Sequence, residues 1–128
     1  MDRQEYRPGL FKGRRTYRRT DIIGFAPPYD VSAILQDRQE ALWFGTNAGL
    51  IKYQGNTRTL YTVKDGLAGD AVRAIIEDRQ GTLWIGTYGG LSALENGQFL
   101  SYRRSDGLGS DQVRALYEDH DGALWIGT

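Results

Sequence analysis

The stretch "GTLWIGTYGGL", residues 81–91, decides the fold of this chain. It is too apolar for an exposed loop. Its glycines argue against a helix, because a glycine in a helix interior costs about 1 kcal/mol relative to alanine. A short apolar run that contains β-branched and aromatic residues and ends at glycines is typical of a buried strand followed by a turn. We therefore expect one strand at 82–87 and a second strand at 90–94.

Two near copies of this stretch occur elsewhere in the chain. They are "QDRQEALWFGTNAGL" at 36–50 and "EDHDGALWIGT" at 118–128, and they place Trp43, Trp84 and Trp125 at a constant spacing of 41 residues. A period of about 40–50 residues is typical of propeller blades, but HEAT-like helical repeats have similar lengths. The period alone therefore does not decide between the two folds.

The residue types within one unit favour strands. Short apolar runs are separated by turn signals, and Asn96-Gly97 is the strongest short hairpin signal, since both positions of a type I′ turn need positive φ. We predict four antiparallel strands in the central unit, at 72–77, 82–87, 90–94 and 98–103. Equivalent strands are expected at 31–36, 42–46, 49–53, 58–63, 113–118 and 124–127.

The predicted fold class is all-β: a β-propeller fragment of four-stranded antiparallel blades, with about two full blades and partial ones. Blade repeats are expected at 31–63, at 72–103 and, incomplete, at 113–128, within a partial propeller that covers 16–128. Residues 1–15 match no repeat and are expected to form a disordered or linker-like basic tail.

Propeller blades are buried on both faces, because each blade lies between two neighbours. We therefore expect Trp84 and Ile85 to pack on opposite faces of one strand, and all three indoles to lie between blades. Gly86 is expected to let a neighbouring blade approach the backbone closely. Two blades alone would expose large apolar faces, so the expected partners are the remaining propeller blades or other copies of the chain.

The central copy carries the signature "V-x-x-I-x-x-D-x-x-G-x-L-W-I-G-T-x-x-G-L" at 72–91. This signature resembles the two-component regulator propeller repeats of the sensor regions of bacterial hybrid histidine kinases. The resemblance covers about residues 29–128, and the first copy departs from it at Glu40 and Phe44. It implies a module of the periplasmic part of a signalling protein, a small polar ligand such as an oligosaccharide, and membrane attachment only through the parent protein.

Composition limits the other classes of function. Lys+Arg and Asp+Glu are 16 each, which argues against general attraction to nucleic acid or anionic lipid. The absence of cysteine excludes disulfides and thiolate metal sites, and we expect neither a metal nor a cofactor. No apolar run is long enough to span a membrane, and the first residues lack the apolar segment of a signal peptide. The basic run "KGRRTYRR" at 12–19 is interpreted as a solvated tail or linker rather than a nucleic-acid site.

The leading functional expectation is a ligand-sensing or interaction module without enzymatic activity of its own. The alternatives are a propeller-based lyase or hydrolase and a self-assembling, lectin-like propeller segment. An enzyme would need converging acid and base groups, whereas the single histidine, His120, lies in a predicted turn. "DHDG" at 119–122 resembles the start of a calcium loop, but its register is wrong and the distal glutamate is missing, which favours a turn.

Candidate ligand-binding residues gather on one face of the predicted disc, where the loops after the second and fourth strands of each unit meet. Arginine offers a planar set of donors to a carboxylate or sulfate. The alternative is that Arg73 forms a surface ion pair with a loop aspartate such as Asp70. The candidate residues are Asn47, Asp70, Arg73, Tyr88, Asp111 and Arg114.

The repeated tryptophans are expected to be structural, and so are the aspartates that begin the turns between the first and second strands. An aspartate in such a turn accepts hydrogen bonds from nearby backbone N–H groups. The structural repeat positions are therefore Asp37, Trp43, Asp78, Trp84, Asp119 and Trp125.

Overall fold

The computed structural model describes residues 29–128, which fold into three antiparallel sheets. The expected basic tail, residues 1–15, and residues 16–28 lie outside the described residues. The two four-stranded sheets are simple meanders, with strand orders β1-β2-β3-β4 and β5-β6-β7-β8, and β9 pairs with β10. Their bounds are β1 Val31–Gln36, β2 Leu42–Thr46, β3 Gly49–Gln54, β4 Thr57–Tyr61, β5 Val72–Glu77, β6 Leu83–Thr87, β7 Gly90–Glu95, β8 Gln98–Tyr102, β9 Ala115–Glu118 and β10 Leu124–Gly127.

This arrangement confirms the all-β fold class of four-stranded antiparallel blades. Asn96 and Gly97 both take positive φ, at 52° and 78°, as the predicted hairpin turn requires. β4 ends at Tyr61, two residues earlier than expected, because Thr62 caps the short 3₁₀ turn η1 (Val63–Asp65). A second 3₁₀ turn, η2 (Arg104–Asp106), follows β8 at the equivalent place.

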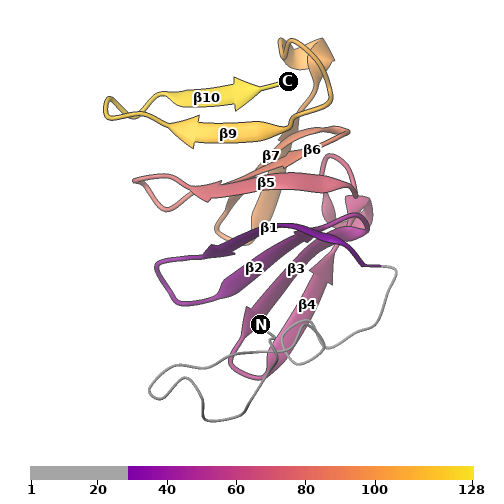
Figure 1. Cartoon of the computed structure of the whole chain (residues 1–128), viewed down its shortest axis with the longest axis vertical. Helices are drawn as coiled ribbons and strands as arrows, with labels where there is room; N and C mark the ends of the chain where they lie inside the picture. The colour runs from indigo at the N-terminus through magenta and orange to yellow at the C-terminus, as the bar shows by residue number, and fades with distance from the viewer. Residues whose placement is uncertain (1–28) are drawn as a thin grey trace, which may run out of the picture.

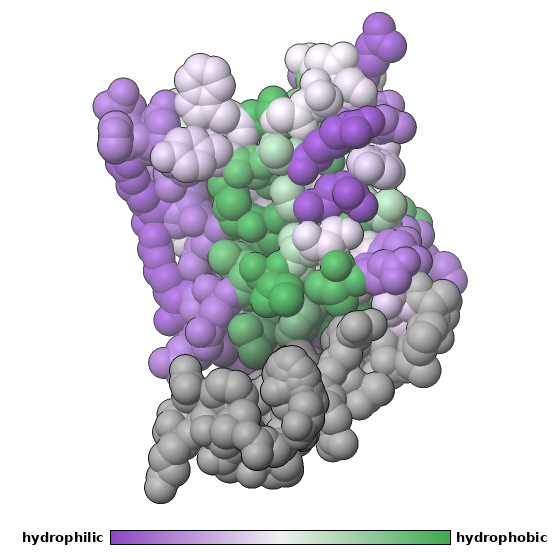
Figure 2. All heavy atoms as spheres, in the orientation of Figure 1, coloured by the Kyte–Doolittle hydropathy of each residue, from purple (hydrophilic) through white to green (hydrophobic). Residues whose placement is uncertain are grey.

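The three sheets stack as successive blades, with β1, β5 and β9 lying one above another (Figure 1). One apolar core fills the space between the first two blades. Trp43 and Leu50 of the first blade pack there with Val72, Ile75 and Ile85 of the second. Figure 2 shows apolar side chains gathered over the stacked strands and hydrophilic ones along the turns at the left edge.

Glycine allows the blades to approach closely, as expected for Gly86. A Cβ atom at Gly86 would lie 2.7 Å from Cγ1 of Val113 in the next blade. The equivalent atom at Gly45 would lie 2.5 Å from Cγ1 of Val72. Both valines are fully buried, so a bare glycine backbone makes room for the first residue of the neighbouring unit.

The expectation that all three indoles lie between blades is wrong for Trp125. Trp43 is 3% exposed under the second blade, Trp84 is half-buried, and Trp125 is 63% exposed. Exposure rises because the described part of the third blade has two strands, and no described blade lies beyond it. A hollow of about 470 Å³ beside Trp84, lined also by Leu100 and Tyr102, lies on the incompletely covered face of the second blade.

Candidate functional site

The loop between β4 and β5 lies on one face of the disc, and its polar side chains form hydrogen bonds with its own backbone. Thr62 and Asp65 form a capping box, in which the Asp65 carboxylate accepts from the Thr62 N–H at 2.9 Å. Asp70 Oδ1 accepts from the Val63 N–H at 3.0 Å. The loop after β8 repeats this bond, since Asp111 Oδ1 accepts from the Arg104 N–H at 2.6 Å.

The same loop is anchored to the second blade. Leu67 and Ala68 are buried, and the Ala68 N–H donates to Ser92 Oγ of β7 at 2.8 Å. Ser101 Oγ donates to the Gly66 carbonyl at 2.7 Å. The loop therefore joins the first blade to the second as a fixed part of the structure.

The short loops between the second and third strands complete this face. Thr87 is fully buried, and its hydroxyl donates to the Gly90 carbonyl and accepts from the Gly89 N–H. These bonds fix the turn that carries Tyr88, whose N–H donates to the Ala71 carbonyl at 3.0 Å. In the first blade, the Asn47 N–H makes the equivalent bond to the Asp30 carbonyl at 3.1 Å, and Asn47 Oδ1 also accepts from the Asp30 N–H at 2.9 Å.

Of the candidate ligand-binding residues, the structure brings Arg73, Tyr88 and Arg114 together. The guanidinium carbon of Arg73 lies 5.2 Å from the centroid of the Tyr88 ring, and that of Arg114 lies 5.8 Å from it. Tyr88 is 37% exposed. The Arg73 and Tyr88 side chains come from the second blade and Arg114 from the third, so the cluster bridges two blades.

The alternative ion pair between Arg73 and Asp70 is not formed in the structure. Within residues 29–128, the polar partner of Arg73 is the hydroxyl of Ser32, at 3.4 Å, and that of Arg114 is the Gln112 side-chain oxygen, also at 3.4 Å. Both partners are neutral. Asp70 and Asp111 serve the loop backbone, whereas the two arginines keep most of their donors available.

The aspartates of the turns between the first and second strands lie on the opposite face of the disc, where each one stabilises its own turn. Asp78 Oδ1 accepts from the backbone N–H groups of Gln80 and Thr82, each at 2.9 Å. Its Oδ2 accepts from the indole Nε1 of Trp84 at 2.9 Å, a bond that the sequence analysis did not foresee. The pairs Asp37–Trp43 and Asp119–Trp125 repeat this bond at 2.8 Å. The constant spacing of six residues between each aspartate and its tryptophan was the available signal.

These bonds shift the acidity of the aspartates. Partial desolvation raises the pKa of Asp37 and Asp78, but the indole and backbone donors outweigh it, and the net pKa lies below the ordinary value. At Asp119 the indole hydrogen bond is the largest influence and also lowers the pKa. The charged carboxylate is therefore the form that holds each turn.

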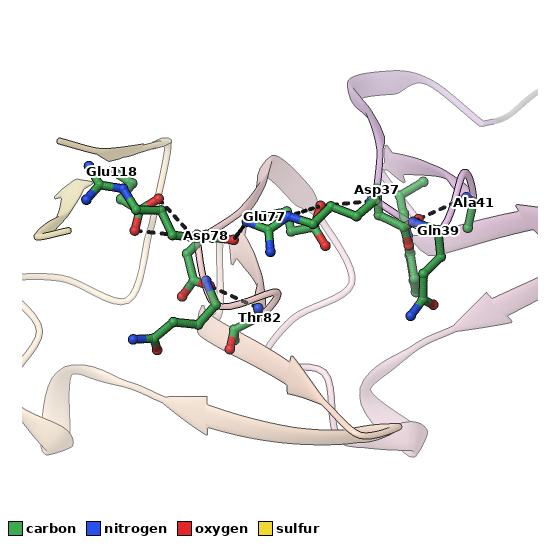
Figure 3. Close-up of polar contacts among 11 residues, drawn as sticks. Asp37, Gln39, Ala41, Glu77, Asp78, Thr82 and Glu118 are labelled. Carbon is green, nitrogen blue, oxygen red and sulfur yellow. Dashed lines mark hydrogen bonds and ion pairs between the residues drawn. The ribbon is translucent and has the colours of Figure 1, made fainter. Parts of the chain in front are cut away.

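A further contact, which was not predicted from the sequence, joins the turns of successive blades (Figure 3). Arg38 Nη2 donates to the Asp78 carbonyl at 2.8 Å, and its backbone N–H donates to Glu77 Oε1 at 3.0 Å. Arg79 makes the same bonds to the third blade, to the Asp119 carbonyl at 2.6 Å and to Glu118 Oε1 at 3.1 Å. We call this arginine–acid contact the interblade latch.

Residues 29–128 hold no group of three or more His, Asp or Glu side chains placed to bind a metal ion. That part of the chain also has no helix of the length and hydropathy that crossing a membrane requires.

The stacked antiparallel sheets, joined by hydrogen bonds between the turns of successive blades, define a β-propeller segment. The family described as two component regulator propeller matches the chain at residues 26–48, 66–89 and 107–128, which together are more than half of its length. The chain belongs to this family. It is therefore a propeller domain of the regulator type rather than a catalytic domain. The search of curated proteins found no match.

Solved structures share the fold of this chain. The extracellular domain of BT3049 from B. thetaiotaomicron, described as a hybrid two component system, aligns with a TM-score of 0.72 and 23% identity over 88% of this chain. The extracellular domain of BT4673 from the same organism, described in the same way, aligns with a TM-score of 0.69 and 25% identity over 85% of this chain. The chain spans 16% of the length of each.

Proposed function

We propose that the chain is part of the extracytoplasmic sensor region of a bacterial two-component signalling protein. The observation that carries the proposal is the family match, in which all three 41-residue copies take part. The likeness to the extracellular domain of BT4673 supports the same region and the same side of the membrane. The parent protein would be a histidine kinase located in the membrane, with this propeller in the periplasm.

The proposed role of the domain is to bind a small polar ligand, such as an oligosaccharide, on the loop face. Loops held on a rigid scaffold are common ligand sites, and the loop face here is pinned by Asp70, Ser92 and Thr87. Ligand binding would favour one arrangement of blades or protomers, and the linked kinase would respond to that change.

Further blades, or other copies of the chain, are the proposed partners. Ile34 is 64% exposed at one end of the described stack, and Trp125 is 63% exposed at the other. Additional blades would bury these side chains as the second blade buries Trp43. Neither the enzyme nor the lectin-like alternative gains support from the comparisons.

The test uses the complete protein encoded by the reading frame that contains this chain, reconstituted in nanodiscs. Autophosphorylation is measured with and without a panel of neutral and acidic saccharides. We expect at least one compound to change the phosphorylation rate, and we expect the response to disappear when the propeller blades are deleted. A complete protein without a kinase region, or a response that survives the deletion, would contradict the sensor function.

A further inference from the structure

We infer that Arg73, Tyr88 and Arg114 form a site for an anionic group, a carboxylate or a sulfate, carried by the ligand. The inference rests on the proposed sensor function and narrows the chemical class that the loop face would recognise. It depends on three properties of the cluster: its placement, its uncompensated charge and its rigidity.

The placement follows from the repeat. Ser32, Arg73 and Arg114 are equivalent residues in successive units, each directly after the valine that opens the unit. The register of β5 against β6 shifts between Val72 and Ala74, so Arg73 sits at a β-bulge. Bulges commonly redirect a side chain beside a functional site. Arg73 Nη1 lies 3.4 Å from Ser32 Oγ, so equivalent positions in neighbouring blades lie within reach of one another.

The charge of the cluster is uncompensated within residues 29–128. No carboxylate of that part of the chain lies within ion-pair distance of Arg73 or Arg114, and the polar partners described above are neutral. Two positive charges facing one ring repel each other. A bound anion would relieve this repulsion and accept charge-assisted hydrogen bonds from both guanidinium groups.

Tyr88 gives the site its rigidity. Its ring lies under both guanidinium groups and offers them a cation–π contact. The backbone of Tyr88 is held by Ala71, and its turn by the buried Thr87 hydroxyl. A site already ordered in this way loses little conformational freedom when it binds.

The cluster is not a structural requirement of the repeat. In the first blade the arginine position is Ser32 and the tyrosine position is Asn47, and that blade folds with the same strands. A residue needed to build every blade would appear in every copy. The arginines and the tyrosine belong instead to the second and third units, which localises the site between them.

The test is isothermal titration of the purified chain at low ionic strength with matched probes. The probes are glucose, sodium glucuronate and glucose 6-sulfate, with sodium acetate and sodium sulfate as the bare anions. We expect the charged sugars to bind, glucose to bind at least about tenfold more weakly, and affinity to fall as salt is added. The glucuronate and sulfate arms distinguish which anion the site prefers.

Variants separate the site from the rest of the surface. R73A and R114A should each weaken binding of the charged probe about tenfold or more, because each removes a charge-assisted hydrogen-bonding group. R58A is the matched control, since this exposed arginine lies near the start of β4 in the first blade, at the other end of the strands. Its affinity should equal that of the unaltered chain. Circular dichroism of each variant shows that the fold is retained.

Three results would overturn the anion site: no charged probe binds, glucose binds as tightly as glucuronate, or R73A and R114A keep full affinity. The sensor function is judged separately by phosphorylation of the complete protein. A response to a neutral saccharide that is insensitive to R73A and R114A would retain the sensor function and reject the anion site.

Discussion

Replacing Gly45 by alanine tests whether contact between blades limits stability. The added Cβ would lie 2.5 Å from Val72 Cγ1 and 3.2 Å from its Cβ, whereas carbon atoms in favourable contact are about 3.5–4.0 Å apart. Val72 is fully buried in the core between the blades, so it has little room to move away. Overpacking of this kind costs about 1–3 kcal/mol, a large part of the stability of a small domain.

The assay is urea unfolding of the purified chain, followed by tryptophan fluorescence. Gly127 is the matched control, because it occupies the equivalent position in the third blade. A Cβ there would lie 3.2 Å from Ala115 Cβ, but it meets no valine of a following blade in the described residues. We expect G127A to lower the free energy of unfolding by less than about 1 kcal/mol.

A double-mutant cycle isolates the contact. V72A removes the methyl group that the new Cβ would strike, so G45A/V72A should be less destabilised than the sum of the two single variants by about 0.5–3 kcal/mol. The reasoning is refuted if G45A costs no more than G127A, or if the cycle shows no coupling between positions 45 and 72.

Three other predictions follow from the turns. E40G should raise the free energy of unfolding by about 0.5–1 kcal/mol in the same urea assay, because Glu40 holds a φ of 68° at a position where Gly81 and Gly122 stand in the other units; an unchanged or lower stability would contradict this. D78N should cost about 1–3 kcal/mol by thermal unfolding, since the amide nitrogen that replaces one carboxylate oxygen cannot accept the indole hydrogen bond. Finally, the pKa of Asp78 is lower in the folded state than its ordinary value of 3.8. The charged carboxylate therefore stabilises the fold at neutral pH, and this contribution is lost as the pH falls below 3.8 and through the pKa of the folded state. Unfolding measured across this range should show a weaker pH dependence for D78N than for the unaltered chain, and equal slopes would show that Asp78 is not responsible.

Much of the fold could be predicted because it is encoded locally. Short apolar runs and turn residues fixed the strands of the central unit to within one residue, and the glycine after Trp84 and Ile85 signalled the close approach of the next blade. The exposure of Trp125 could not be read from its own segment, which is nearly identical to that of Trp84. Its burial depends on whether a further blade covers it.

The candidate site was predicted only in part, since its contacts join residues that the sequence separates widely. Arg73, Tyr88 and Arg114 could be assigned to one face from the strand order, but their meeting on a single ring depends on the angle between blades. The latch between Arg38 and Glu77 joins residues 39 positions apart. The triplet at 77–79, an acid, an aspartate and an arginine, recurs in part at 36–38 and at 118–120. This was the available signal, but it does not distinguish a bond within one blade from a bond to the next.

The interblade latch has a direction: the first and second blades each give an arginine to the next blade, and the second and third blades each present an acid to the blade before. A head-to-tail contact of this kind can be repeated from one blade to the next until the rotation between successive blades closes a ring. The second unit carries both partners, Glu77 and Arg79, so duplication or loss of that whole unit in the gene would leave the same arginine–acid pair at each remaining junction. Recombination between such units would change the number of blades without requiring a new kind of junction.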